Sequence, residues 1–289
     1  MTLRFDELFY KMTGSGNDFL FFDRSRLPAE EVERSELASA DRIRALCARG
    51  TGVGGDGIVI LHQSSAADFG ILYFNSDGSR ASLCGNASLC TTRLAAALGL
   101  GAASGMSFET DAGVLRARLS DGLPEIDFDP PSGVQADIAI PLLSGERRIG
   151  FATAGVPHVV VLVDDVAAVD LAARGRELRW HPDFAAGANA NFVGRGPEGW
   201  SIRTFERGVE GETLACGTGA VATAVLLDAW GQGGATTTLR TASGQPLTVR
   251  TATGQARVSL RGEGRLVFRG ELPADRGDSH GASALAGWT

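Results

Sequence analysis

Residues 205–219 read Phe-Glu-Arg-Gly-Val-Glu-Gly-Glu-Thr-Leu-Ala-Cys-Gly-Thr-Gly. The run 220–230 that follows is rich in Ala, Val and Leu, contains no Pro or Gly, and stops at Gly231, where a glycine is expected after a helix. The pattern predicts a helix of about four turns with Cys216 at its N-terminal end. A thiol there feels the positive end of the helix dipole and unpaired N–H groups, which favour the thiolate.

The same arrangement occurs earlier in the chain, where Cys84-Gly85-Asn86-Ala87 opens the run 88–98 and Gly99 closes it. We interpret the chain as a diverged duplication, and we expect two equivalent lobes to bring two cysteine-bearing helix N-termini face to face across one cleft. Laid over each other without a gap, the segments match at Cys84 and Cys216, Gly85 and Gly217, Thr91 and Thr223, Leu94 and Leu226, Ala97 and Ala229, and Gly99 and Gly231.

Composition limits the classes of function. The chain has 289 residues, 44% hydrophobic and 21% charged, which is ordinary for a globular protein long enough for two lobes. Its formal charge of −7, with a single lysine, gives no basic patch for nucleic acid. The charged N-terminus does not fit a secretory signal, and no apolar run is long enough for a membrane helix. We therefore expect a cytoplasmic protein whose four cysteines form no disulfide framework.

Short strands with few helices predict an α+β fold with a mostly antiparallel sheet. Helices are expected at 29–48, at 166–174 and in the two cysteine-led runs. Strands are expected at 8–12, 19–23, 58–61, 69–74, 106–110, 114–119, 138–142, 148–152, 159–163, 189–193, 201–205, 235–240, 247–251, 256–260 and 265–269.

A stretch rich in Pro, Ser and Gly at 130–135 marks the expected boundary between the lobes. The N-terminal lobe would span residues 1–130 and carry Cys84, with the last strand, about 264–272, as a candidate addition. The C-terminal lobe would span 131–263 and carry Cys216. Residues 273–289 are rich in Ala, Gly, Asp and Ser and are expected to form a disordered tail.

Other motifs have plainer interpretations. The glycine loops at 14–16 and 50–57 fit neither a P-loop nor a dinucleotide fingerprint. No Cys-x-x-Cys pair suggests zinc, so no metal is expected, and Cys47 and Cys90 are interpreted as buried packing residues. The simplest interpretation of His158 is a polar residue near a strand start whose hydrogen bonds are satisfied within the protein. Beside Glu206 and two thiols, however, it could help to set which thiol is ionised.

Taken together and in order, several segments resemble the diaminopimelate epimerase family, whose members are cofactor-independent amino-acid epimerases of lysine and peptidoglycan biosynthesis. The resemblance covers nearly the whole chain short of the tail. It rests on residues 9–19, 52–57, 74–79, 84–86, 157–158, 189–192 and 206–219.

The resemblance implies two similar lobes, each a curled sheet around a central helix, with the active site in the cleft between them, and a homodimer. Inverting an amino-acid α-carbon needs a base on one face and an acid on the other, and Cys84 and Cys216 resemble such a thiolate and thiol pair. No cofactor is then required. Donors for the substrate carboxylate would be the N–H groups of Gly85, Asn86, Gly217 and Thr218. The family further implies Asn17, Asn75, Asn189, Glu206 and Arg207 as substrate-binding residues, with His158 and Glu206 tuning the thiols.

The chain departs from the family pattern at three places. Val156 stands where the family often has Asn, the segment 87–90 lacks the usual Gly-x-Arg-Cys, and Glu210 lengthens the loop after Arg207. Val156 leaves open a related racemase acting on another amino acid, such as proline or histidine. A thiol redox protein is a third hypothesis, although redox motifs usually place their thiols close together in sequence.

Overall fold

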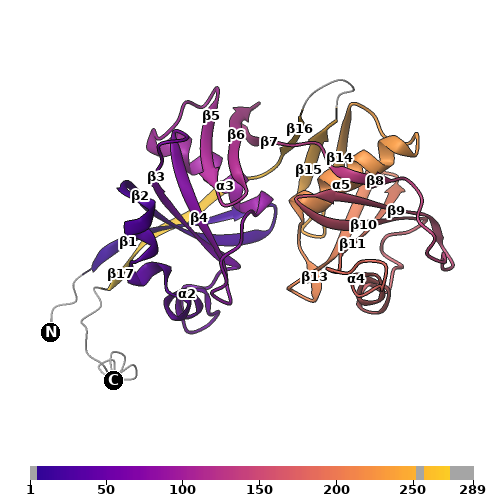
Figure 1. The fold of residues 1–289 in the computed structure, drawn as a ribbon, viewed down its shortest axis with the longest axis horizontal. Helices are drawn as coiled ribbons and strands as arrows, with labels where there is room; N and C mark the ends of the chain where they lie inside the picture. The colour runs from indigo at the N-terminus through magenta and orange to yellow at the C-terminus, as the bar shows by residue number, and fades with distance from the viewer. Residues whose placement is uncertain (1–4, 252–256, 274–289) are drawn as a thin grey trace.

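A computed structural model of the chain describes residues 5–251 and 257–273, and Figure 1 shows two lobes side by side. The tail expected at 273–289 lies outside the described residues except for Pro273. In the described part of the chain, no helix is long and apolar enough to span a membrane.

The first lobe surrounds helix α3 (Gly85–Leu98), which begins directly after Cys84. Its sheet contains β1 (Phe5–Gly14), β2 (Asn17–Pro28), β3 (Gly57–Gln63), β4 (Phe69–Asn75), β5 (Met106–Thr110), β6 (Gly113–Ser120) and β7 (Leu123–Phe128). Short helices α1 (Ala29–Glu33), η1 (Glu36–Ala38) and α2 (Ala40–Cys47) cover its outer side.

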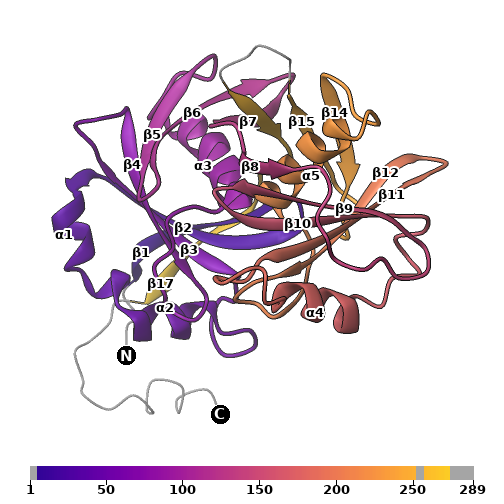
Figure 2. The ribbon, with the colours of Figure 1, turned by 45° about the vertical axis from the view of Figure 1, so that its right-hand side comes forward.

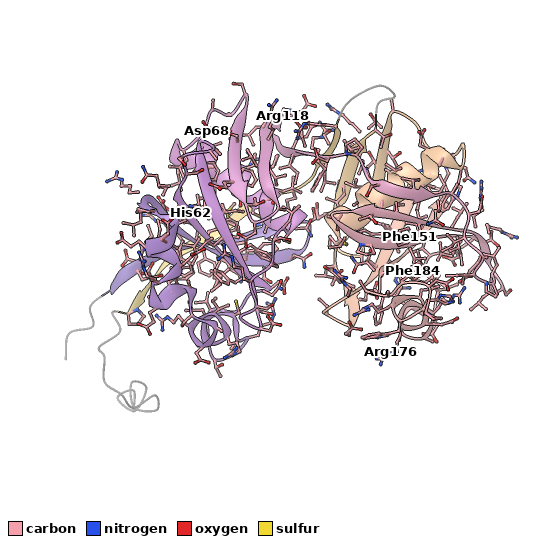
Figure 3. The ribbon with its side chains drawn as sticks, viewed as in Figure 1. His62, Asp68, Arg118, Phe151, Arg176 and Phe184 are labelled. Atoms are coloured by element: carbon pink, nitrogen blue, oxygen red, sulfur yellow. The ribbon has the colours of Figure 1, made fainter. Side chains whose placement is uncertain are left out.

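The second lobe surrounds helix α5 (Gly217–Ala229), which begins directly after Cys216. Its sheet contains β8 (Ser132–Gln135), β9 (Glu146–Ala154), β10 (Val156–Val163), β11 (Asn189–Gly196), β12 (Gly199–Glu206), β13 (Gly211–Thr213), β14 (Thr236–Arg240), β15 (Pro246–Arg250) and β16 (Val258–Arg261). A π-helical turn, η2 (Leu171–Gly175), and α4 (Arg176–Arg179) cover the outer side, where Phe151 and Phe184 stack with ring centroids 5.3 Å apart (Figure 3).

Strand pairing repeats between the lobes. From β1 to β7 the successive pairs are antiparallel, parallel, antiparallel, parallel and twice antiparallel. The series β9, β10, β11, β12, β14, β15 and β16 repeats this order. The last strand, β17 (Arg265–Pro273), pairs with β1 as β8 pairs with β9. The fold prediction of two pseudo-symmetric α+β lobes is confirmed.

One strand pair joins the lobes. The equivalent strands β7 and β16 are antiparallel neighbours, so a continuous sheet runs through both halves. Because β7 pairs within the first lobe and β8 within the second, we propose that the lobe boundary falls in the connection between them, near Pro130.

Each central helix is buried on nearly all sides. Helix α5 is almost wholly apolar, whereas in α3 the buried Thr91 and Thr92 hydroxyls donate to backbone carbonyls of the same helix. Leu89 and Leu94 of α3 belong to the same hydrophobic core as Leu226 and Leu227 of α5. Figure 2 shows the two helices near the centre of the molecule with the strands around them.

Two expected helices are wrong in part, one expected strand is wrong, and strands β7, β8 and β13 are not among the expected strands. The helix expected at 29–48 breaks into three, because the Ser35 hydroxyl donates to the Val32 carbonyl (2.6 Å) and Ser39 caps the start of α2. Residues 138–142 form no strand, since Pro141 has no N–H to offer a ladder. The helix expected at 166–174 begins only at Leu171. Strand β7, whose Pro124 is a poor strand signal, is an additional strand.

We predict that Leu260→Ala destabilises the protein by about 2–5 kcal/mol, the usual cost of truncating a fully buried leucine. Leu260 lies on the joining strand β16, and its Cδ2 would be 3.5 Å and 2.9 Å from Cβ atoms added to Gly85 and Gly217. Urea denaturation gives the free energy of unfolding. Leu143→Ala, at a site 51% exposed, is the control and should change it by less than about 0.5 kcal/mol.

Candidate active site

The N-termini of the two central helices touch. A Cβ added to Gly85 would lie 3.3 Å from the Gly217 Cα, and one added to Gly217 would lie 3.3 Å from the Gly85 Cα. A side chain at either position would be packed more tightly against the facing helix than is usual, so glycine at both positions suits this approach. Cys84 and Cys216, the residues just before these glycines, have nearly the same extended backbone, with φ of −134° and −126°. The duplicated motif therefore brings the two cysteines to one place.

The Cys84 thiol is half-buried between the lobes. Its pKa is raised to about 11, chiefly by burial and also by the negative charge of Glu206. The backbone N–H groups of Ala87 and Asn86 and the Tyr73 hydroxyl lower the pKa without cancelling the effect of burial. At neutral pH Cys84 is therefore a thiol.

The Cys216 thiol is more deeply buried, and burial raises its pKa well above the usual range for cysteine. The charge of Glu206 again adds to the shift, whereas the Thr218 hydroxyl, 3.6 Å from Sγ, and the Gly219 N–H oppose it. The N–H groups at each helix start lower the thiol pKa, as expected, but desolvation outweighs them at both cysteines, so each pKa is raised.

Glu206 ends strand β12 and acts on both thiols. Burial raises its own pKa, against a lowering contribution from the Thr213 hydroxyl, and the charge of Asp56 also raises it. One carboxylate thus influences the ionisation of both cysteines.

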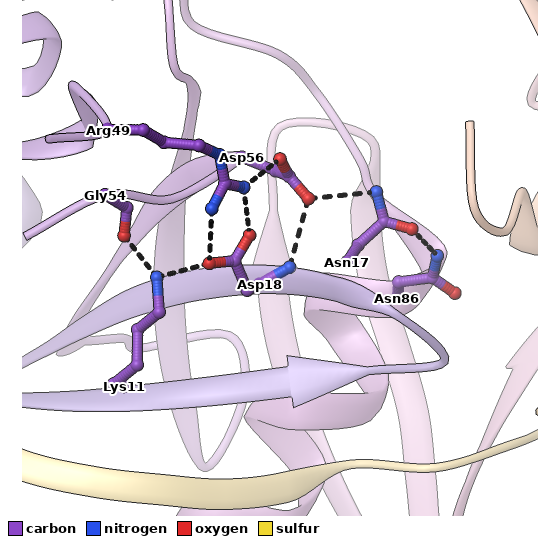
Figure 4. Close-up of polar contacts among 7 residues, drawn as sticks. All are labelled: Lys11, Asn17, Asp18, Arg49, Gly54, Asp56 and Asn86. Carbon is purple, nitrogen blue, oxygen red and sulfur yellow. Dashed lines mark hydrogen bonds and ion pairs between the residues drawn. The ribbon is translucent and has the colours of Figure 1, made fainter. Parts of the chain in front are cut away.

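Asn86 connects the two lobes beside the cysteines (Figure 4). Its Nδ2 donates to the Asn17 Oδ1 and to the backbone oxygen of Ala215, both at 3.0 Å. Asn17 in turn donates from Nδ2 to the Asp56 Oδ2 at 3.2 Å. The second glycine loop therefore holds Asp56, and through it Asn17, in place.

A charged cluster supports this chain of amides (Figure 4). Arg49 donates to Asp18 and, at 2.8 Å, to Asp56, while Lys11 pairs with Asp18 at 2.5 Å and donates to the Gly54 carbonyl. Burial raises the pKa of Asp18, but the hydrogen bonds from Arg49 and Lys11 prevail and hold it below its usual range. Asp18 therefore stays ionised, and its pairs with Lys11 and Arg49 keep the loop fixed.

The remaining predicted residues lie at strand ends around the helix N-termini. Asn189, at the start of β11, accepts from the Arg207 N–H (2.7 Å), and the Arg207 Nη1 donates to the Ala186 carbonyl (3.1 Å). His158 is fully buried on the neighbouring strand β10, and burial, aided by the charge of Arg207, lowers its pKa to about 3. A neutral imidazole influences its surroundings through hydrogen bonds rather than charge.

Asn75 ends β4 and belongs to a contact that the sequence does not predict. Tyr73, two residues earlier on the same strand face, donates its hydroxyl to the Asn75 Oδ1 at 3.0 Å and also faces the Cys84 thiol. Tyr73 lies two residues before Asn75, and residues two apart on a strand share a face of the sheet. This spacing could have identified Tyr73 as a site residue. Asn191 has the same spacing from Asn189.

Within residues 5–251 and 257–273, no group of three or more His, Cys, Asp or Glu side chains is arranged to hold a metal ion.

The two repeated lobes place the chain in a class of two-lobed α+β folds that several solved structures share. A solved hydroxyproline epimerase from Agrobacterium vitis, with bound trans-4-hydroxy-L-proline, has this fold with a TM-score of 0.63, 20% identity and 93% coverage of both chains. A PhzF-family phenazine biosynthesis protein from Bacillus anthracis matches with a TM-score of 0.68 and 14% identity, over 92% of this chain and 98% of its own.

The chain belongs to the diaminopimelate epimerase family, whose sequence model matches residues 9–131 and 150–272. The diaminopimelate epimerase of Gemmatimonas aurantiaca is 51% identical over 279 residues, covering 91% of this chain and 98% of the relative. That of Aquifex aeolicus is 38% identical over 273 residues, with 91% and 97% covered. The two family segments coincide with the structural repeat, and the protein is an isomerase.

We predict that Glu206→Gln lowers the pKa of both active-site thiols, because it removes the negative charge that opposes their ionisation. Each unit of lowering gives about tenfold more thiolate at a fixed pH below the pKa, and alkylation by iodoacetamide becomes faster in proportion. Rates measured against pH, with peptide mapping to separate the cysteines, test this. Glu212→Gln, which removes the partner of Arg203, is the matched control and should leave both rates unchanged.

Proposed function

We propose that this protein interconverts LL- and meso-diaminopimelate by moving a proton between Cys84 and Cys216. One observation carries the proposal: the N-termini of two helices, each preceded by a cysteine, meet at Gly85 and Gly217. The chain is also 51% identical to a named diaminopimelate epimerase. A base and an acid on opposite sides of one carbon are what inversion requires.

In each turnover one cysteine acts as thiolate and takes the α-proton, and the other, as thiol, gives its proton to the opposite face of the carbon. The products are the inverted amino acid, a thiol where the thiolate was and a thiolate where the thiol was, so charge and protons balance. The raised thiol pKa values suit this step, because a more basic thiolate is a stronger acceptor for a weakly acidic carbon proton.

The carbanion formed in this step needs its charge spread onto the neighbouring carboxylate. Neither cysteine side chain caps its helix, and the N–H groups of Gly85, Asn86, Gly217 and Thr218 stand at the two helix starts. We assign these groups to the reacting carboxylate, because helix N-termini bind anions. They are preorganised, so they stabilise the developing charge without rearrangement.

The distal end of the substrate carries a second ammonium and a second carboxylate. We assign this end of the substrate to the polar residues that the family resemblance implies. Arg207 would pair with the carboxylate, and the amides of Asn17, Asn75 and Asn189 would fix its orientation. Asn189 already holds the Arg207 backbone, and Asp56 and Asn86 hold the Asn17 amide. These contacts favour a rigid, selective site.

Val156 begins β10 beside this set and is half-buried. Its side chain can offer no amide contact to the distal end of a substrate. Because relatives over nearly the full length are diaminopimelate epimerases, we assign this chain the same substrate rather than another amino acid. A role in making lysine and peptidoglycan precursors follows. All four cysteines are free thiols, which supports a reducing, cytoplasmic compartment.

We also infer that the protein forms a homodimer through β17. This strand pairs only with β1 among the described residues, so its other edge is open to pairing with another chain. Leu266, Val267 and Phe268 on this strand are each nearly half exposed, and Leu8 on β1 is exposed beside them. An apolar edge of this kind is a natural interface for a second copy.

The first functional prediction concerns the two thiols. We expect Cys84→Ala and Cys216→Ala each to reduce epimerisation of LL-diaminopimelate by about 10²–10⁴-fold, because each removes one partner in proton transfer. Inversion is followed by NMR in D2O, where the α-proton signal is lost as deuterium enters.

Cys90→Ala is the matched control, since Cys90 is fully buried in the core, only six residues after Cys84, and should retain activity within a few-fold. Full inversion by either active-site variant would contradict the two-thiol mechanism. Exchange with proline or histidine in place of diaminopimelate would leave that mechanism intact and move the substrate assignment to a related racemase.

The second prediction concerns assembly. Light scattering after size exclusion should give the unaltered protein twice the chain mass of 30.1 kDa, and Phe268→Asp should give the single-chain mass, because a charge is buried in the proposed interface. Leu143→Asp, at a site exposed to a similar extent in the second lobe, should remain dimeric. A single-chain mass for the unaltered protein would disprove the inference.

A further inference from the structure

A row of polar side chains crosses three strands of the second lobe. His158 on β10 is in register with Asn189 on β11, and Asn191, two residues further along β11, is opposite Thr204 on β12. Residues in register, and residues two apart along a strand, share a face of the sheet. This face is the one that α5 covers, because a Cβ added to Gly219 would lie 2.3 Å from the Asn191 Oδ1.

The partners of Asn191 fix the orientation of its amide. Nδ2 lies 3.0 Å from the backbone oxygen of Val159, an atom that can only accept. On the other side, the Thr204 hydroxyl donates to Oδ1 at 3.0 Å. Exchanging the two amide atoms would place oxygen against oxygen at Val159, so the network determines which atom is nitrogen.

The same Nδ2 lies 3.2 Å from the His158 Nδ1. An amide nitrogen only donates, so the His158 Nδ1 must accept, and in a neutral imidazole the single ring proton then resides on Nε2. One Nδ2 hydrogen serves Val159 and the other serves His158. Asn191 is fully buried, and both its Nδ2 and its Oδ1 have partners, with the Asn189 carbonyl a more distant third neighbour of Nδ2 at 3.5 Å.

We propose that Asn191 is a positioning residue that locks His158 as the Nε2–H tautomer, so that His158 offers the ligand one hydrogen-bond donor and no base. Nε2 is buried and has no hydrogen-bond partner in the described part of the chain, which indicates that a ligand atom completes it. Under the proposed function, this acceptor is a carboxylate oxygen of the amino-acid substrate. Only the identity of this ligand rests on the proposed function.

The test reads the tautomer directly. The full chain is labelled with [15N]histidine, and long-range 1H–15N spectra are recorded without ligand at neutral pH. The His158 signals are identified by their loss in His158→Gln. We expect a protonated Nε2 and an unprotonated Nδ1, since the two states differ widely in nitrogen chemical shift. A proton on Nδ1, or on both nitrogens, would overturn the proposal.

Two variants then test the role of Asn191. Asn191→Ala removes the donor, so the tautomer preference should be lost and kcat should fall about tenfold or more. Asn191→Asp places an acceptor opposite Nδ1 and should move the proton there. Val193→Ala, the next buried residue on the same strand face, is a comparable truncation and should leave the tautomer unchanged.

The outcomes separate this inference from the proposed function, because the spectra need no substrate. The expected tautomers with no epimerisation of diaminopimelate would reject the function and keep the inference. An unchanged Nε2–H tautomer in Asn191→Ala would reject the inference, whatever the activity. If Asn191→Asp does not fold, the unaltered protein and Asn191→Ala still decide the question.

Discussion

The contact between Gly85 and Gly217 is the constraint on which the rest of the structure depends. Glycine at both helix starts lets the two N-termini come together, and the sheets around them hold the helices at a fixed distance. The pairing of β7 with β16 supplies that distance, and Leu260 on β16 fills the space beside both glycines. The strands of the duplicated halves therefore form two hydrophobic cores and also position the two central helices. They bring two positive helix ends, each preceded by a thiol, to a single point.

The two halves share a strand topology, but the side chains at equivalent positions near the cysteines differ in polarity. The two thiols therefore have different surroundings. In the first lobe the row across β2, β3 and β4 contains Phe19, Gly57 and Asn75. The corresponding row in the second lobe contains His158 and Asn189 and ends with Glu206. The carboxylate of Glu206 acts on both thiols, whereas the Tyr73 phenol stands beside Cys84. An enzyme that inverts a carbon in both directions needs two groups that can each act as the base. It also needs to bind its substrate in a single orientation. Divergence of the polar rows provides that asymmetry without moving either cysteine.

The sequence predicts the parts of this arrangement that are local in the chain. Cys84 and Cys216 could be placed at helix starts because each precedes an apolar run ended by glycine, and the repeat of that pattern predicts two lobes. Residues 138–142 were harder to assign, because their apolar side chains pack on the outer core while Pro141 prevents strand pairing. Asn191 and Tyr73 could not be assigned a role, since their contacts depend on which strands are neighbours and in what register. One sequence alone does not supply that information.

The direction of the thiol pKa shifts reflects two opposing influences on each cysteine. A helix N-terminus lowers a thiol pKa, yet burial and the charge of Glu206 raise it more at both cysteines. A low pKa would give an abundant but weak base, poorly matched to a carbon acid. A high pKa gives a strong base that is scarce until positive charge arrives. The ammonium group of an amino acid would bring that charge, so the thiolate would become populated mainly when there is a proton for it to remove. In the proposed mechanism, burial of the thiols would thereby couple their ionisation to substrate binding.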